Sequence, residues 1–400
     1  MNLFNPLNFH RRLARFSNFN QDDLELVNKY LSEEELSAQI EIFMKKYIGV
    51  KYAIVIPSAR SGIDFILKAI NVKKEENVVT QAFGCREVIE TINENCKTKY
   101  CDIEENTFNI SVDRVIQAID NNTKAVLPIN IYGNPADMVS LKKICKKEKV
   151  LLIEDCAHSL GAEIDGIKSG SFGDVSIFSF GKTFLTKGGV LMTNNKELFE
   201  KIKNIRDKYQ INKKRNISRF FGKLALTSIV KLKKFKIMST FSFILFKLFE
   251  KLNLIYGKES SLLAPNNFEL SLALSQIRRN EVLFQKLKNN YKRLYDLLKN
   301  EKDLELLPYK NGSLALRFPI KFKNNVNPLE LTKYLFRKGC FEPSLNYYNE
   351  YLANIKGVKE PEKSLPVSDK TARKSIVVMQ DNLPEKDLIE LKNLILDFIS

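Results

Sequence analysis

Residues 151–195 bring together side-chain types that could form a ligand-binding or catalytic site. Asp155 ends an apolar run that is typical of a buried strand, and Ser179 ends a second one. Two lysines, Lys182 and Lys187, follow Ser179 along the chain. Because ligands in open α/β sheets bind beyond the carboxyl ends of strands, we expect these side chains to meet at one edge of a sheet. An acid, a hydroxyl and an amine placed there could transfer protons and attach a ligand covalently.

The elements that must position these residues follow a regular alternation. Residues 32–49 are predicted to be a helix that ends at Gly49, and a strand follows up to Pro57. Further strands are expected in ENVVTQAF, TKYCDI, AVLPINIYG, VLLIED and DVSIFSF, separated by helical segments such as DRVIQAID and DMVSLKKICKKEK. This alternation is typical of a mainly parallel sheet covered by helices on both faces. We therefore predict a large α/β domain at 50–205, preceded by an N-terminal helical segment at 1–49.

The remainder of the chain divides into two further parts. Residues 206–262 are predicted to be a basic, apolar helical insertion, and residues 263–400 an interface helix followed by a smaller α+β domain. Within this last part, 266–298 has the pattern of one long helix. GSLALRFPIKF is predicted to be a strand, and PLELTKYLFRKG and EKDLIELKNLILDFI are predicted to be helices.

The stretch from Glu154 to Gly189 resembles the DegT/DnrJ/StrS family of sugar aminotransferases, which are pyridoxal-phosphate enzymes. The family motif is roughly E-D-x-A-[QH]-x-x-G-A, then S-x-G-D-x-x-x-F-S-F, then a lysine before G-G. The matching residues are Glu154, Asp155, Ala157, His158, Gly161, Ala162, Ser171, Gly173, Asp174, Phe178, Ser179, Phe180, Gly188 and Gly189. IPSARSGIDFIL, YGNPADM and NNFELSLALSQI extend the resemblance over most of the chain. It implies the aspartate-aminotransferase-type fold (pyridoxal-phosphate fold type I), with a seven-stranded-type, mainly parallel sheet.

The resemblance implies a role for several residues. Asp155 would keep the pyridine nitrogen of pyridoxal phosphate protonated, and His158 would contact the ring or its substituents. The backbone amides of Ala59 and Arg60, at the start of a helix, and the hydroxyl of Ser179 would bind the phosphate. Each residue taken singly also has a structural interpretation, as a strand-end acid, a buried histidine or a serine that lines the core.

Two further predicted contacts depart from the family pattern. The position that often carries an aromatic ring stacked on the cofactor falls at Cys85, with Phe83 nearby as a substitute. The asparagine through which the partner subunit contacts the phosphate corresponds to Asn267 or to its neighbour Asn266. Cys85 and Asn267 are therefore included among the predicted cofactor-binding residues.

The lysine that forms the Schiff base is a choice between two residues. The family spacing is usually S-x4-K-x6-G-G, and Phe184 occupies the place of the lysine when it is measured from Ser179. Lys182 departs from the spacing by two residues on one side and one on the other, whereas Lys187 departs by three and six. We therefore predict Lys182, with Lys187 as the second choice. Some relatives carry a histidine there and act as dehydratases, but this loop has no histidine.

The resemblance implies an enzyme, a transferase that moves an amino group. An amino donor, glutamate, would load the cofactor, and a keto sugar linked to a nucleoside diphosphate would receive the amine. The resemblance also implies a homodimer with a shared active site and a role in polysaccharide or glycan biosynthesis. The loop between Ser179 and Gly188, here called the lysine loop, is shorter than in the family pattern. The alternative is therefore a catalytically inactive relative that binds nucleotide sugar or regulates a partner.

Positive charge is concentrated in residues 208–258. This segment holds 13 Lys and Arg against one acid, Glu250, and therefore +12 of the formal net charge of +17. The apolar run FSFILFKLF lies in the same segment, and the combination is typical of a helix bound to an anionic membrane surface. The alternative is an insertion packed on the main domain or on the dimer partner. Nucleic acid is not an expected partner, because no binding module accompanies the charge.

Cysteine usage and the N-terminus indicate the compartment. The six cysteines have no paired spacing and only His10 and His158 occur, so neither a disulfide framework nor a metal site is expected. Residues 1–16 lack the apolar core of a cleavable signal, and no uncharged apolar run is long enough to span a bilayer. We expect a cytoplasmic protein, with peripheral binding to the inner membrane face through 208–258.

Overall fold

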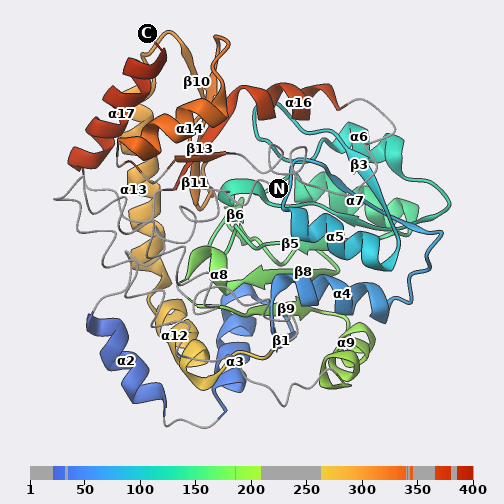
Figure 1. Ribbon diagram of the computed structural model, residues 1–400. Helices are drawn as coiled ribbons and strands as arrows, with labels where there is room; N and C mark the ends of the chain where they lie inside the picture. The colour runs from blue at the N-terminus through green and yellow to red at the C-terminus, as the bar shows by residue number, and fades with distance from the viewer. Residues whose placement is uncertain are drawn as a thin grey trace, which may run out of the picture.

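The computed structural model describes residues 21–31, 35–184, 186–208, 263–338, 340, 343–345, 365–379 and 385–399. In this part of the chain a seven-stranded sheet carries helices on both faces, and a four-stranded antiparallel sheet lies near the C-terminus (Figure 1). The fold class predicted from the sequence is therefore confirmed. Of the predicted insertion at 206–262, residues 209–262 lie outside the described residues, and so do 1–20.

The large sheet has the strand order β1-β9-β8-β5-β4-β2-β3. Its strands are β1 (Tyr52–Ile56), β2 (Asn77–Gln81), β3 (Lys97–Cys101), β4 (Thr123–Leu127), β5 (Leu151–Asp155), β8 (Val175–Ser179) and β9 (Gly189–Thr193). The paired strands from β3 to β8 are parallel, whereas β9 is antiparallel to both of its neighbours. Six of the seven strands fall on segments identified in the sequence. β9 was missed there, although it begins at Gly189, the second residue of the Gly188–Gly189 pair.

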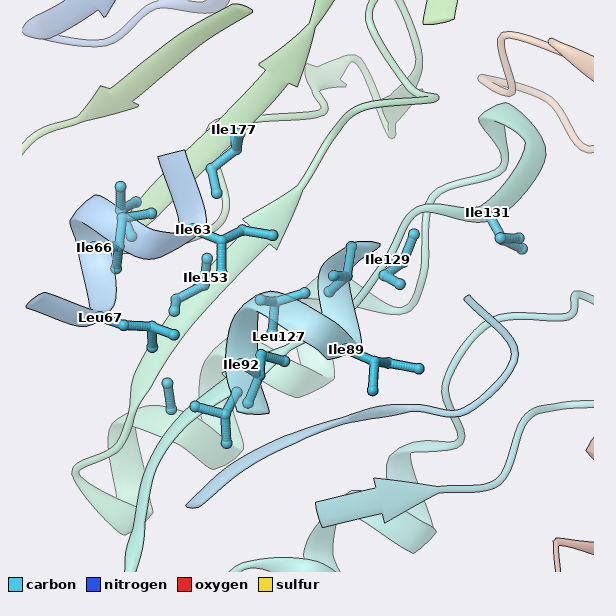
Figure 2. Packing of buried hydrophobic residues seen from close by; sticks show 14 of the residues in the cluster. Ile63, Ile66, Leu67, Ile89, Ile92, Leu127, Ile129, Ile131, Ile153 and Ile177 are labelled. Carbon is cyan, nitrogen blue, oxygen red and sulfur yellow. The ribbon is translucent and has the colours of Figure 1, made fainter. Parts of the chain in front are cut away.

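One face of the sheet is covered by α4 (Ala59–Ala69), α5 (Arg86–Asn95) and α9 (Lys196–Lys208). Figure 2 shows Ile63, Ile66 and Leu67 of α4 and Ile89 and Ile92 of α5 directed at the isoleucines and leucines of the central strands. Fully burying such a side chain contributes about 1.5–3 kcal/mol. The apolar contacts therefore fix α4 on the sheet, and with it the position of the helix N-terminus.

The opposite face carries two groups of helices. The helices α3 (Leu36–Ile48) and α12 (Asn267–Arg278) pack over β1, β9 and β8, and α2 (Gln21–Leu31) lies against α12 (Figure 1). The helices α6 (Val112–Ala118) and α7 (Met138–Glu148) pack over β2, β4 and β5. The predicted first helix ends at Gly49 as expected, where φ is +83°, but its described part begins only at Leu36.

The predicted long helix at 266–298 is wrong in one respect, because the structure divides it into two. The helix α12 ends at Arg278 and α13 (Asn280–Leu298) begins one residue later, with Arg279 at φ −109° and ψ 18° between them. The two parts pack on different partners: α12 lies on α2 and α3, and α13 lies on α17 (Glu385–Ile399) and the small sheet. A straight helix could not bury both apolar stripes, so the chain breaks where the partner changes.

The smaller domain is an antiparallel sheet in the order β10-β11-β13-β12. Its strands are β10 (Leu304–Leu306), β11 (Arg317–Phe322), β12 (Pro343–Leu345) and β13 (Ser375–Met379), and its helices include α14 (Pro328–Arg337), α16 (Pro366–Arg373) and α17. Asp102 of the large domain accepts hydrogen bonds from the backbone N–H groups of Val367 and Ser368 at 3.0 and 2.8 Å. This carboxylate caps α16 and so ties the two domains together.

The two edges of the large sheet are closed in different ways. At β1, the N–H of Val55 donates to Oε1 of Glu41 on α3 at 2.8 Å, and Arg206 of α9 donates to the carbonyl of Val55 at 3.4 Å. Burial raises the pKa of Glu41, although the Val55 N–H acts against this shift. At the other edge, β3 carries Lys97 and Lys99. Side chains that occupy or charge an edge strand in this way keep it from pairing with further strands.

Candidate functional site

The strand register brings the predicted site residues to one edge of the sheet. Ile56, the last residue of β1, pairs with Gly189, which in turn pairs with Ser179 at the end of β8. On the other side of β8, Asp155 at the end of β5 pairs with Ile177. The start of α4, the lysine loop and Asp155 therefore lie together at the carboxyl edge, which is where ligands bind in sheets of this type (Figure 1).

Asp155 is a buried carboxyl group with few hydrogen-bond partners. Its side chain is part of a residue that is 3% exposed, and Oδ1 accepts one hydrogen bond, from the N–H of Ala157 at 2.9 Å. Among the described residues, no donor is found for Oδ2. Burial raises the pKa of Asp155 to about 6; the Ala157 N–H and the charge of Lys182 lower it, and Glu154 raises it. A cationic group bound beside this carboxyl would therefore stabilise its ionised form.

Lys182 lies in α8 (Phe180–Thr183), a single helical turn that directly follows β8. Its side chain is half-buried, and its charge acts on the Asp155 carboxyl, so the ammonium group lies within electrostatic range of that site. Lys187, also half-buried, lies at the far end of the loop, next to Gly188. The loop is closed by a hydrogen bond of 3.0 Å from the Phe180 N–H to the Gly188 carbonyl.

The Gly188–Gly189 pair is required by the backbone. Gly188 has φ +104°, a left-handed conformation that residues with a Cβ rarely adopt. A Cβ on Gly189 would lie 2.1 Å from the carbonyl oxygen of Phe178. The pair that marks the motif in the sequence therefore allows the close approach of β9 to β8, beside the lysine loop.

The start of α4 offers two backbone amides. Ser58 caps the helix: its Oγ accepts the Ser61 N–H at 3.1 Å, and Ser61 Oγ accepts the Ser58 N–H at 3.0 Å. The N–H groups of Ala59 and Arg60 donate to none of the described residues. The guanidinium of Arg60 is used elsewhere, in an ion pair of 2.6 Å with Glu94 of α5. The two amides, with the positive end of the helix dipole, suit an anion such as a phosphate.

His158 is buried and held by the turn η2 (Ile131–Gly133). The backbone N–H of Tyr132 donates to its Nδ1 at 3.3 Å, and the two rings stack at 6.3 Å between centroids with an interplanar angle of 14°. Tyr132 has φ 55° and ψ 17°, the left-handed region that non-glycine residues rarely adopt. His158 therefore has a fixed ring orientation three residues from Asp155.

Phe83 and Cys85 differ in how deeply they are buried. Phe83 is fully buried, with edge-to-face contacts to Phe108 at 5.4 Å and to Tyr132 at 6.3 Å. Cys85 precedes α5 and is half-buried, and its Sγ donates to Oε2 of Glu87 at 2.7 Å. The ring of Phe83 belongs to the core, and Cys85 is the residue that offers surface at this position.

The two asparagines at the start of α12 also differ in their hydrogen bonds and exposure. Asn266 caps the helix: its Oδ1 accepts the Glu269 N–H at 2.8 Å, and its own N–H donates to Glu269 at 3.1 Å. Asn267 is exposed. Thr186 of the lysine loop donates to the carbonyl of Glu269 at 2.8 Å, so the start of α12 lies against that loop within one chain.

Sequence reasoning missed the part played by Glu154, the neighbour of Asp155. Its carboxylate is completely buried and accepts five hydrogen bonds. The donors are Asn130 Nδ2 and Ser169 Oγ, both at 3.1 Å, Gly170 N–H at 2.8 Å, and the N–H groups of Phe172 and Gly173, both at 3.1 Å. The matches at Glu154 and Gly173 are therefore structural. The sequence signal for this structural role was the glutamate at the end of an apolar strand, because a buried carboxylate requires hydrogen-bond donors.

The chain belongs to the DegT/DnrJ/EryC1/StrS aminotransferase family, which matches residues 21–243. The family is pyridoxal-phosphate-dependent. The comparison agrees with the resemblance noted in the sequence, and it covers the sheet, the lysine loop and the capped start of α4.

Among the relatives is the UDP-4-amino-4,6-dideoxy-N-acetyl-beta-L-altrosamine transaminase of Campylobacter jejuni, 33% identical over 50% of this chain and 55% of that protein. The GDP-perosamine synthase of Vibrio cholerae is 29% identical over 44% of this chain and 49% of that protein. The chain thus spans about half the length of the curated relatives it matches. The Escherichia coli GDP-4-keto-6-deoxy-D-mannose-3-dehydratase, solved with bound hydrated PLP, has the same fold: TM-score 0.74, 17% identity, over 94% of this chain and 97% of that one.

Proposed function

We propose that this protein is a pyridoxal-phosphate-dependent aminotransferase that acts on a keto sugar linked to a nucleoside diphosphate. The observation that carries the proposal is the meeting of Asp155, Lys182 and the two amides of α4 at one sheet edge. The described residues fit the cofactor: a buried carboxyl with an oxygen that no described residue hydrogen-bonds, a nearby lysine, and two N–H groups without acceptors. When bound, pyridoxal phosphate supplies an electron sink for the carbon that gains or loses the amine.

Each residue then has a task that its surroundings permit. Asp155, ionised beside a cation, keeps a proton on the pyridine nitrogen, because opposite charges stabilise each other in a buried site. Lys182 would hold the cofactor covalently, and its amine would serve as the base that moves a proton. The amides of Ala59 and Arg60 bind the phosphate, and the hydroxyl of Ser179 adds a further donor. Cys85 and Asn267 complete the predicted contacts, Asn267 from the partner subunit.

The substrates, oligomeric state and membrane contact belong to the same proposal. The relatives named as transaminases and synthases of amino sugars support a nucleotide-linked keto sugar as acceptor and a role in polysaccharide biosynthesis. We take glutamate as the amino donor and a homodimer as the active form. The charge of 208–258 supports peripheral binding to anionic lipid at the inner membrane face. No described helix combines the length and apolar character needed to cross a bilayer.

The decisive experiment identifies the lysine. Purified protein is loaded with pyridoxal phosphate, treated with borohydride, digested and sequenced by mass spectrometry. We expect a visible absorption band that borohydride removes and a cofactor mass on the peptide that contains Lys182. Lys182→Ala should lose both signals, and its turnover should fall by at least about 10²–10⁴-fold, the contribution of a positioned base alone.

Lys187→Ala is the matched control, because it removes a lysine from the same loop. It should keep the band and the labelled peptide. Labelling at Lys187 would replace the assignment of Lys182 but keep the reaction class. The absence of any band in the wild-type protein would overturn the proposed function and favour the alternative, a relative without catalytic activity that binds nucleotide sugar or regulates a partner.

A further inference from the structure

The turn η2 does more than pack against the site, because its backbone contacts a nitrogen of His158. The N–H of Tyr132 lies 3.3 Å from Nδ1, and both residues are buried. A backbone amide can only donate, so Nδ1 must be the acceptor and carry no hydrogen. In a neutral imidazole the hydrogen is then on Nε2, since one ring nitrogen donates and the other accepts.

We propose that Tyr132 is a positioning residue that fixes His158 in the Nε2–H tautomer, so that the ring offers a hydrogen-bond donor to an oxygen acceptor of the bound cofactor. The second part rests on the proposed function, whereas the first concerns the protein alone. A histidine without such a partner could present either nitrogen as donor, and the Nδ1–H tautomer would offer a lone pair of Nε2 to that oxygen instead of a hydrogen.

The backbone of the turn supports this role. Tyr132 has φ 55°, and the following Gly133 has φ 88°, so two consecutive residues adopt the left-handed region. A tyrosine held there costs on the order of 1–3 kcal/mol, which the surroundings must offset. The turn is held from its other side as well: the carbonyl of Gly133 accepts the Leu314 N–H at 2.9 Å and Ser313 Oγ at 2.9 Å, both from the C-terminal part of the chain.

The ring of Tyr132 fixes the plane of the imidazole, and the rest of the network fixes the chain around it. The rings are nearly parallel, at 14°, and the Tyr132 ring also makes an edge-to-face contact with the buried Phe108 ring, at 6.3 Å between centroids. Asn130, two residues before Tyr132, donates its N–H to the Asp155 carbonyl at 3.1 Å. One short segment therefore holds the backbone at Asp155 and the ring of His158.

The tautomer can be observed directly, because His158 and His10 are the chain's two histidines. His10→Gln leaves a single imidazole. Solid-state ¹⁵N NMR of the full-length, ring-labelled protein at pH 7.5, without cofactor, should show an unprotonated Nδ1 and a protonated Nε2. A hydrogen on Nδ1, on both nitrogens, or a mixture of tautomers would overturn the proposal.

A matched pair of variants separates the backbone from the ring. Tyr132→Asn and Tyr132→Val both remove the ring, but asparagine tolerates the left-handed conformation and a β-branched residue does not. We expect the single Nε2–H tautomer in the Asn variant and a mixture in the Val variant. A mixture in both would assign the tautomer to ring stacking instead, and a single tautomer in both would remove Tyr132 from the explanation. Circular dichroism checks that each variant folds; if the Val variant does not, the Asn variant and the wild-type spectrum still decide.

The link to the cofactor has its own readout. The amide of glutamine reaches the position of Nε2 and the amide of asparagine that of Nδ1, so His158→Gln keeps a donor that His158→Asn lacks. Titration with pyridoxal phosphate should give a dissociation constant within about threefold of wild type for Gln and at least about tenfold weaker for Asn, the size of one lost hydrogen bond to a charged group. Equal weakening of both would overturn the donor role. Failure of the wild-type protein to bind would refute the proposed function and leave the tautomer result standing.

Discussion

Glu154 and Asp155 are consecutive carboxylates on β5 that differ in almost every physical respect. Successive side chains of a strand point to opposite faces, so the two carboxylates meet different surroundings. Glu154 accepts five hydrogen bonds and Asp155 accepts one. The first is satisfied by its own chain, and the second is buried with an oxygen to which no described residue donates. One family motif thus places side by side a structural acid, Glu154, and, under the proposed function, a chemical acid, Asp155.

The structural acid should dominate stability. In Glu154→Gln one oxygen becomes an NH₂ group that faces N–H donors, and two buried donors are left unsatisfied. At about 1–3 kcal/mol for each, the free energy of unfolding should fall by about 2–6 kcal/mol. Urea denaturation of the cofactor-free protein measures this change. The control is Glu200→Gln, an exposed acid on α9, which should lie within about 0.5 kcal/mol of wild type.

The chemical acid should dominate turnover. Asp155→Asn keeps the shape of the side chain but cannot hold a positive charge on the pyridine nitrogen. We expect the single-turnover reaction of cofactor-loaded protein with glutamate, followed by visible absorption, to slow by about 10²–10³-fold, typical of losing one preorganised electrostatic contact. Glu154→Gln molecules that remain folded should react at a rate closer to wild type. If Asp155→Asn reacted within about threefold of wild type, Asp155 would not be the partner of the cofactor.

Asp155→Asn should have a favourable effect on the cofactor-free protein: it should raise the free energy of unfolding. The pKa of Asp155 is raised from 3.8 to about 6, so ionisation is easier in the unfolded chain. Its contribution to stability is fully present below pH 3.8 and is lost as the pH rises through about 6. Asp155→Asn avoids this loss and should become more stable than wild type with rising pH, by up to about 3 kcal/mol. Urea denaturation at pH 5, 6, 7 and 8 tests it; a difference that shrinks with pH would contradict the assigned surroundings.

Much of this arrangement follows from local sequence patterns. The strand that ends at Asp155, the capped start of α4 after Ser58 and the stop at Gly49 each depend on residues within a few positions of one another. Such patterns are set by hydrophobic periodicity and by capping, and both can be read from a single segment. The lysine loop was located for the same reason, from the strand before it and the Gly-Gly pair after it.

The interactions that were missed join segments far apart in the sequence. Asn130 reaches Glu154 across 24 residues, and Tyr132 reaches His158 across 26. The break at Arg279 depends on packing partners at opposite ends of the chain, α2 and α3 for α12 and α17 for α13. The hydrophobic periodicity within 266–298 does not reveal these partners. β9 was missed because its position between β1 and β8, antiparallel to both, has no local signature in its own five residues.

The closed edges of the large sheet restrict how copies of this chain can associate. An edge strand with free N–H and C=O groups invites pairing with another molecule and, through it, unlimited growth. At β1 the N–H and C=O groups of Val55 are already occupied by Glu41 and Arg206. At β3 the exposed Lys97 places a charge on the strand, and Lys99 forms an ion pair of 2.6 Å with Asp120. Copies of this chain should therefore associate through helices and loops rather than by extending the sheet, which favours a closed assembly such as the proposed homodimer over fibres.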